Sequence, residues 1–161
     1  MTANERHKQM TAALGRIPSG LFVLTVRHGE AETGMLASWV QQCSFEPPQI
    51  SIALKSDRPV WAWLSDGAPF TLNILDDSQT DIVGHFGRGF ALQEFAFTGL
   101  TVERPNGAAP VLNEALAYLE CRVAGRVSAG DHDLLIGLVV GGAMLSDGQP
   151  MVHVRKNGSH Y

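Results

Sequence analysis

Residues 34–48 have the sequence GMLASWVQQCSFEPP and lie between two apolar segments, Leu21–Val26 and Ile50–Leu54. Small and hydroxyl residues, an amide pair and a rigid Pro-Pro stop follow one another, which is not typical of an ordinary strand and turn. Such a segment offers a short backbone edge with unpaired N–H and C=O groups, followed by a fixed bend. A planar heterocycle with donors and acceptors along one rim fits this edge through main-chain hydrogen bonds.

Short apolar strands on both sides of this segment predict a mainly β fold. The turn residues Ser128–Asp131 between the last two long strands favour antiparallel pairing. Because strands follow one another without an intervening helix, an antiparallel barrel, closed or nearly closed, fits better than a βαβ sheet. The expected strands are Leu21–Val26, Gly34–Gln41, Ile50–Leu54, Phe70–Ile74, Ala115–Val127, Asp133–Gly142 and Met151–Val154, and the expected helices are Glu5–Leu14, Asp57–Leu64 and Ser78–Phe86.

Three of these segments carry specific expectations about burial. Leu21–Val26 is continuously apolar, which predicts a strand buried on both faces. Phe70–Ile74 alternates apolar residues with Thr71 and Asn73, which predicts a half-buried strand. Gly87–Pro110 has poor periodicity and several breakers, so we expect a long excursion over the surface.

The composition is that of a folded chain of 161 residues, with 45% hydrophobic residues and a formal net charge of −4. At this length we expect one domain, residues 1–161. The mild acidity argues against a nucleic-acid partner, and no run of about 20 apolar residues is present to cross a membrane. The first eight residues are polar and charged, and Cys43 and Cys121 lie far apart. We therefore expect a cytoplasmic protein with two reduced, largely buried thiols.

Most familiar catalytic signatures are missing from the chain. No GxGxxG follows the first strand, and there is no P-loop, no HExxH and no nucleophile elbow. No pair of the six His has the i, i+4 spacing of metal ligands. Asp131-His132-Asp133 is the densest acid–imidazole cluster, but alternate residues of an extended chain face opposite sides, so a metal site is not expected there.

A second candidate binding feature is the stretch Lys55–Arg58, which precedes the expected helix Asp57–Leu64. Ser56 stands where an N-cap residue belongs, and Pro59 is tolerated in a first turn. Free N–H groups at a helix start together with two nearby cations are typical of an anion site.

These features resemble the flavin reductase-like family, whose members fold as an FMN-binding split barrel. The likeness covers nearly the whole chain, and together with Ser38–Gln42 the closing residues are most similar to the flavin reductase-like domain at the end of cyanobacterial flavodiiron proteins. The segments that carry the resemblance, in order, are Ile17–Gly20, Gly34–Pro48, Lys55–Arg58, Phe70–Leu75, Glu120-Cys121, Gly130–His132, Gly137 and Val152–Tyr161.

The resemblance also implies roles for individual residues. Those implied at the isoalloxazine, mainly through backbone groups, are Met35, Leu36, Ala37, Ser38, Cys43, Ser44 and Phe45. Those implied at the phosphate end are Lys55, Ser56, Asp57 and Arg58, with Arg88 as a further candidate. His132 is implied near the face where a nicotinamide stacks. The chain departs from the family pattern at Glu94-Phe95, where an Arg-Phe or Lys-Phe pair is usual, and at Pro59, where many members have a hydroxyl residue.

Simpler structural roles compete with several of these assignments. Ser38 and Ser44 also suit turn backbone, and Trp39 suits a core or dimer contact better than a flavin stack. Cys43 is expected to be a buried small hydrophobe. Arg88 equally suits a helix C-terminal cation, and His132 equally suits a turn residue bonded to Asp131.

The resemblance implies an NAD(P)H-dependent flavin reductase that transfers a hydride from nicotinamide to the flavin N5, with FMN, or alternatively FAD, as cofactor. One alternative is an FMN-binding electron-transfer module that a protein partner reduces, and another is a split barrel without flavin. The family also implies a homodimer and a downstream acceptor such as a monooxygenase.

Overall fold

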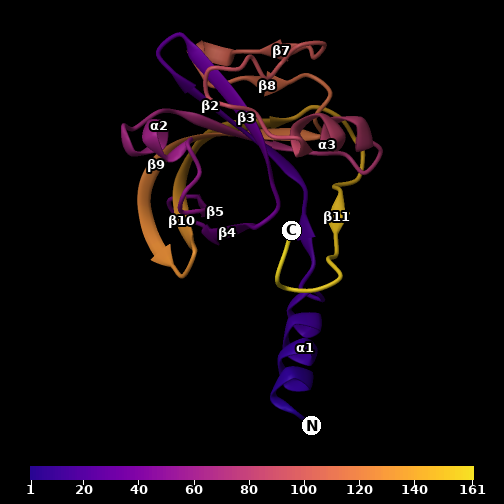
Figure 1. Cartoon of the computed structure of the whole chain (residues 1–161). Coiled ribbons are helices and arrows are strands. Elements are labelled where there is room, and N and C mark those ends of the chain that lie inside the picture. The colour runs from indigo at the N-terminus through magenta and orange to yellow at the C-terminus, as the bar shows by residue number, and fades with distance from the viewer.

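The apolar run Leu21–Val26 forms most of strand β2 (Phe22–His28), which lies inside a seven-stranded antiparallel sheet. The computed structural model describes residues 1–161, and the order of the strands in the sheet is β3-β2-β6-β9-β10-β5-β4. The sheet curls into a split barrel (Figure 1). Its other strands are β3 (Ala31–Ala37), β4 (Val40–Ser44), β5 (Gln49–Lys55), β6 (Phe70–Ile74), β9 (Ala117–Ala129) and β10 (His132–Met144).

Smaller elements surround the barrel. Two short strand pairs join β1 (Ser19–Gly20) to β11 (Val152–His153) and β7 (Val102–Glu103) to β8 (Val111–Leu112), and a 3₁₀ turn spans Pro105–Gly107. The helices are α1 (Ala3–Leu14), α2 (Trp61–Ser65) and α3 (Thr80–Gly87). None of them combines the length and the apolar composition that crossing a bilayer requires.

Helix α1 projects away from the barrel (Figure 1) and contains no buried residue. Thr2 and Glu5 form a capping box at its start, and Gly15 caps its end. The predicted helix Glu5–Leu14 is confirmed, although none of its residues is buried and only its last turn contacts another segment, where the Gly158 N–H donates to the Thr11 carbonyl oxygen. Local capping therefore contributes much of what stabilises this helix.

Two apolar cores lie on opposite sides of β2. Leu24 and Val26 belong to a cluster with β5, β6 and α2, whereas Val23 belongs to a second cluster with α3 and the segment after it. All three side chains are fully buried. The prediction that this strand is buried on both faces is confirmed, because side chains that alternate along a strand reach different cores.

The segment 87–110 was expected on the surface, and the structure corrects this expectation. Ala96, Phe97 and Ala109 are buried, and Phe97 packs in the second core. The segment therefore covers the outer face of the sheet. For the same reason β6 is not half-buried, since Thr71 and Asn73 on that face have no exposed surface.

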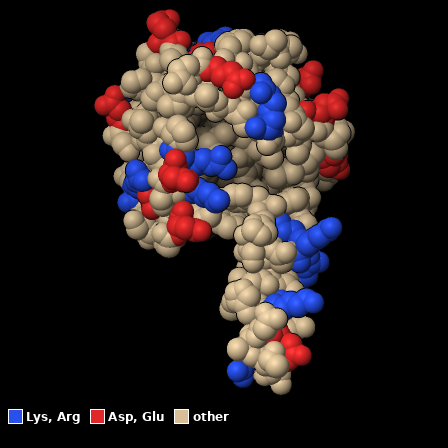
Figure 2. Space-filling model, in the orientation of Figure 1, with Lys and Arg blue, Asp and Glu red and all other residues tan.

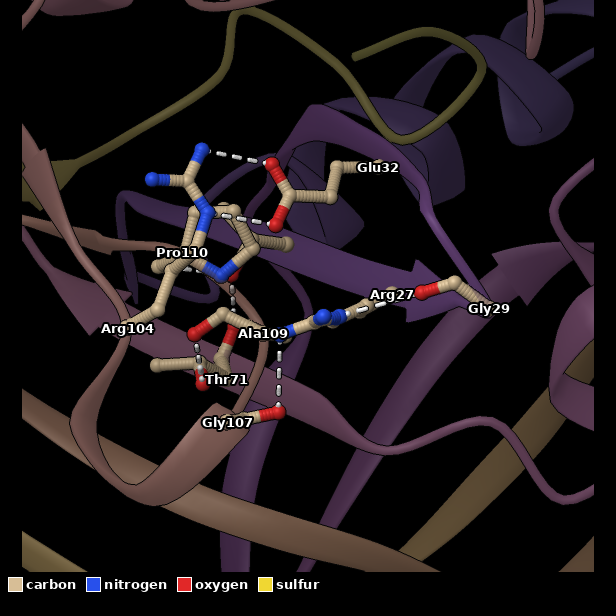
Figure 3. Close-up of polar contacts among 9 residues, drawn as sticks. Arg27, Gly29, Glu32, Thr71, Arg104, Gly107, Ala109 and Pro110 are labelled. Atoms are coloured by element: carbon tan, nitrogen blue, oxygen red, sulfur yellow. Dashed lines mark hydrogen bonds and ion pairs between the residues drawn. The ribbon is translucent and has the colours of Figure 1, made fainter.

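Polar contacts attach this covering segment to the sheet (Figure 3). Thr71 Oγ1 donates to the carbonyl oxygen of Ala109 at 3.0 Å. Arg104 and Glu32 form a two-point ion pair, with N···O distances of 2.6 and 2.7 Å. Buried hydroxyl and amide groups of the sheet are thus satisfied by backbone carbonyls of the segment that covers them.

We predict that Asn73→Ala destabilises the fold by about 2–4 kcal/mol, because Asn73 donates to the Val23 carbonyl oxygen (3.1 Å) and accepts from the Leu112 N–H (2.8 Å) in a fully buried setting. The free energy of unfolding in urea measures the effect. Asn113→Ala is the matched control, since Asn113 is exposed and its side chain bonds only Glu103, and should cost less than about 0.5 kcal/mol. Equal losses in the two variants would contradict the prediction.

Candidate functional site

A pocket of about 330 Å³ lies beside the corner that joins β3 to β4. This volume falls within the range of about 300–1,000 Å³ typical of small-molecule sites. The residues that line it are Leu21, Met35, Leu36, Ala37, Ser38, Ala53, Leu54, Lys55, Arg58, Val83, Phe86, Gly87, Gly89, His153 and Tyr161.

One wall of the pocket is a backbone edge. Strand β3 is an edge strand of the sheet, so alternate N–H and C=O groups along it face away from any strand partner. The same strand is pressed close to α3, because a Cβ at Gly34 would lie 2.7 Å from the Phe86 ring. Leu36 and Phe86 make the neighbouring surface apolar. This wall suits a flat apolar ring with a polar rim.

The corner itself interrupts the strand that we predicted over Gly34–Gln41. Strand β3 ends at Ala37, and β4 starts at Val40, whose N–H donates to the Ser38 carbonyl oxygen at 3.1 Å. The Trp39 carbonyl oxygen accepts from the Ala53 N–H at 2.9 Å. The prediction of one continuous strand over these residues was therefore wrong, because the chain turns here from one edge of the sheet to the other.

Two cations stand at one end of the pocket. Lys55 and Arg58 are both exposed, both line the pocket, and neither forms an ion pair with a carboxylate. In Figure 2, Lys and Arg side chains lie beside a hollow in the middle of the molecular face. Unpaired cations beside an apolar slot favour a ligand with an anionic end.

The predicted N-cap at Ser56 was wrong. Helix α2 begins at Trp61, and no side chain caps it. Lys55–Arg58 instead forms a turn, in which the Ser56 hydroxyl donates to the Asp133 carboxylate at 3.0 Å. Ser56 and Asp57 do not line the pocket. Side-chain cations, rather than the start of a helix, thus provide the positive charge at this end.

An aromatic cluster borders the pocket next to these cations. The ring of Trp39 lies 4.7 Å from that of His132 and 5.2 Å from that of Tyr161, centroid to centroid. His132 is buried, its Nδ1 lies 2.7 Å from Asp131 Oδ1, and its Nε2 contacts the Tyr161 hydroxyl. A second hollow of about 250 Å³ is lined by Trp39, His132 and Lys55 among others.

Two groups in this cluster have shifted pKa values. The hydrogen bond from His132 lowers the pKa of the Asp131 carboxyl, and burial raises the pKa of the Tyr161 phenol. Asp131 is therefore charged and Tyr161 protonated near neutral pH. The phenol can then donate a hydrogen bond to the imidazole.

Cys43, Ser44 and Phe45 were predicted at the same site, but the structure does not bring them to this pocket. They line a separate shallow hollow along β4, and 89% of Phe45 is exposed. Cys43 is exposed too, so the prediction of two buried thiols holds only for Cys121. The reason is that β4 is the other edge strand of the sheet, with its side chains open to solvent.

Arg88 also lies outside the lining of the pocket, although Gly87 and Gly89 belong to it. Its guanidinium pairs with Glu94 at 3.0 Å and lies over the Phe90 ring at 4.0 Å. This pairing lowers the pKa of the Glu94 carboxyl. Arg88 thus has local partners, as expected for a cation at a helix end.

Comparison with known proteins places the fold in context. The model of the flavin reductase like domain family matches residues 14–159. Diflavin flavoprotein A 1 of Synechocystis sp. is 38% identical over 151 residues, which cover 92% of this chain and 26% of that protein. The chain therefore spans about a quarter of the length of this relative.

Solved structures share the architecture across almost the whole chain. The NADH:FAD oxidoreductase of Streptomyces globisporus C-1027 superposes with a TM-score of 0.84 at 23% identity, covering 96% of this chain and 92% of that one. The styrene monooxygenase flavin reductase of Pseudomonas putida S12 gives a TM-score of 0.75 at 26% identity, covering 89% and 90%.

We predict that one thiol reacts fast with a disulfide reagent in the native protein at pH 8 and that two react after denaturation. Burial raises the pKa of the Cys121 thiol to about 12, so roughly one molecule in 10⁴ carries the thiolate at this pH. Exposed Cys43 is the reactive group. Absorbance of the released thiolate measures the reaction. Cys43→Ser should abolish the fast phase, and two fast thiols in the native protein would contradict the structure.

Proposed function

Because this chain belongs to the family of flavin reductase-like domains, we propose that it binds FMN and reduces it with NADH or NADPH. One observation supports this proposal above the others. An apolar slot along an unpaired strand edge ends at two cations, Lys55 and Arg58, that have no carboxylate partner. A flat ring with a polar rim and a phosphate tail matches both parts of this pocket.

The residues present suit each part of the flavin. The backbone at Ala37, the last residue of β3, and at Ser38 in the corner offers hydrogen-bonding groups to the polar rim of the ring, and Leu36 and Phe86 offer apolar contact. The phosphate is assigned to Lys55 and Arg58. Because both cations are exposed, an adenylate attached to the phosphate can extend into solvent, so FAD also fits this arrangement.

The bound flavin supplies the hydride-accepting chemistry. The chain itself provides position and environment: the edge of β3 orients the ring, and the neighbouring apolar side chains exclude water from one side of it. No acid–base residue is required for hydride transfer to an oriented ring, which agrees with the lack of a catalytic triad in the sequence.

We assign the nicotinamide donor to the hollow beside the aromatic cluster of Trp39, His132 and Tyr161. His132 and Trp39 line the hollow beside the pocket, and Lys55 lines both cavities, so two ligands in them would be neighbours. His132 is held by Asp131 and Tyr161 and would orient the nicotinamide rather than exchange a proton with it. The similar proteins described as an NADH:FAD oxidoreductase and as a styrene monooxygenase flavin reductase support a nicotinamide as the donor. The second name also supports a separate enzyme, such as a monooxygenase, as the acceptor of the reduced flavin.

A second candidate is an electron-transfer module that a protein partner reduces. The observation that favours it is that the chain corresponds to about a quarter of a diflavin flavoprotein, so the matched region is one part of a larger flavoprotein. Fast reduction of the bound flavin by a reduced flavodoxin-type or iron–sulfur protein, with slow reduction by nicotinamides, would favour this candidate.

We predict that the purified protein with added FMN oxidises NADH or NADPH, because ligands in the pocket and in the neighbouring hollow would have their rings side by side. Loss of absorbance at the nicotinamide band measures the reaction, with FMN alone as the control. Tight FMN binding without turnover by either donor would contradict the reductase proposal and leave the electron-transfer candidate.

We predict that replacing both cations, Lys55→Met with Arg58→Met, weakens FMN binding about 10- to 100-fold, since each phosphate contact contributes about 0.7–1.4 kcal/mol at an exposed site and two contacts are lost. Riboflavin, which lacks the phosphate, should bind the variant and the parent chain equally well. Fluorescence quenching measures both constants, and Lys156→Met is a matched surface control. A parallel loss of riboflavin binding would assign the cations to the ring instead.

A further inference from the structure

The turn Lys55–Arg58 is fixed by the hairpin end of strands β9 and β10. The Ser56 N–H donates to the Asp131 carbonyl oxygen at 3.0 Å, and the Ser56 hydroxyl donates to Asp133 Oδ1 at 3.0 Å. On its other side, the Trp61 indole donates to the carbonyl oxygen of the first residue of the turn at 3.0 Å. A turn made of exposed residues is thus held at three points.

Asp133 contributes the only carboxylate to these contacts, and its two oxygens have different partners. Oδ1 accepts from Ser56, and Oδ2 accepts from Arg126 Nε at 2.6 Å. Arg126 in turn lies over the Trp61 ring, 3.9 Å from Cζ to the centroid. Asp133 is only 6% exposed, so its carboxylate has little freedom to move.

The charge on Asp133 is secured by its surroundings. The Arg126 guanidinium holds the pKa of the Asp133 carboxyl below its usual range, and the hydroxyl of Ser56 acts in the same direction against the effect of burial. The group is therefore an ionised acceptor at neutral pH. Its ion-pair partner is Arg126, and neither Lys55 nor Arg58 forms an ion pair with Asp133 or with another carboxylate.

We infer that Asp133 is a positioning residue for phosphate recognition, which through Ser56 holds the turn so that Lys55 and Arg58 face the anionic end of the flavin. This inference rests on the proposed function, since it takes the phosphate to lie at these two cations. Asp133 does not line the pocket, so it acts without touching the ligand. A turn that is already fixed loses less conformational entropy when the phosphate binds.

The sign of the effect separates positioning from simple electrostatics. Removing a carboxylate close to an anion site leaves Arg126 unpaired and adds net positive charge, which by charge alone strengthens the binding of an anion. Positioning predicts the opposite, because the turn loses a fixed contact. Ser56→Ala removes the same contact with no change in charge.

The test measures the dissociation constants of FMN and riboflavin for the full chain by quenching of flavin fluorescence. We expect Ser56→Ala and Asp133→Ala each to weaken FMN binding about fivefold or more and to leave riboflavin within about twofold. The double variant should bind FMN no more weakly than the single variant with the lower affinity, since both substitutions remove the same hydrogen bond between Ser56 and Asp133. Asp66→Asn, an exposed carboxylate bonded to His28, is the control and should change neither constant.

Three results would overturn the inference. Unchanged or tighter FMN binding by both single variants would show that the link does not position the turn, and equal losses for FMN and riboflavin would show general damage to the pocket. If the parent chain binds neither flavin, the proposed function fails and the inference fails with it. Ser56→Ala alters an exposed residue, so the comparison remains available even where Asp133→Ala does not fold.

Discussion

The structure depends on a constraint of connectivity: the two edge strands of the sheet, β3 and β4, are consecutive in the chain and joined by Ser38 and Trp39 alone. A seven-stranded sheet satisfies so short a link only by curling until its two edges approach each other. The edges approach without pairing, so the backbone groups of β3 that face away from β2 lack a strand partner. The pocket results from this incomplete closure, and the candidate ligand would take the place of the missing strand.

The second core connects this opening to the opposite side of the sheet. Phe86 is fully packed in that core and also lines the pocket, and Val83 of the same helix does both in part. Phe86 packs there against Phe97 of the segment 87–110, which folds back over the sheet, so this segment helps to fix the position of α3. Packing on the outer face of the barrel in this way determines the shape of one wall of the pocket.

Sequence reasoning succeeded where the local pattern alone decides the structure. The strands Leu21–Val26 and Ile50–Leu54, the hairpin after Ser128 and the apolar face of α3 follow from hydrophobic periodicity and turn residues. Met35–Ser38, Lys55 and Arg58, which were predicted at the flavin from the resemblance, line one pocket, and their roles toward a ligand stay predictions. The errors came from tertiary context, since no local pattern shows that Asp133 competes for the Ser56 hydroxyl.

The remaining site residues come from distant parts of the chain. Leu21, His153 and Tyr161 reach the pocket from opposite ends of the sequence. None of them was predicted at the site, although Val152–Tyr161 carries part of the family resemblance. Gly87–Pro110 looked like a surface excursion because its apolar residues are irregularly spaced. Irregular spacing does not exclude burial when a segment lies flat on a sheet and its backbone accepts the sheet's buried hydroxyls, as Ala109 does from Thr71.

Helix α1 has a different relation to the rest of the molecule, because its twelve residues bury nothing while its end is pressed against the closing segment. A Cβ at Gly15 would lie 2.7 Å from the Asn157 backbone, so this junction leaves no space for a larger residue. Beyond the junction, the helix can fray and re-form without disturbing the barrel. Amide protons of α1 are consequently expected to exchange with solvent orders of magnitude faster than those of β2. One chain thus combines a rigid barrel with a helix that unfolds and refolds locally.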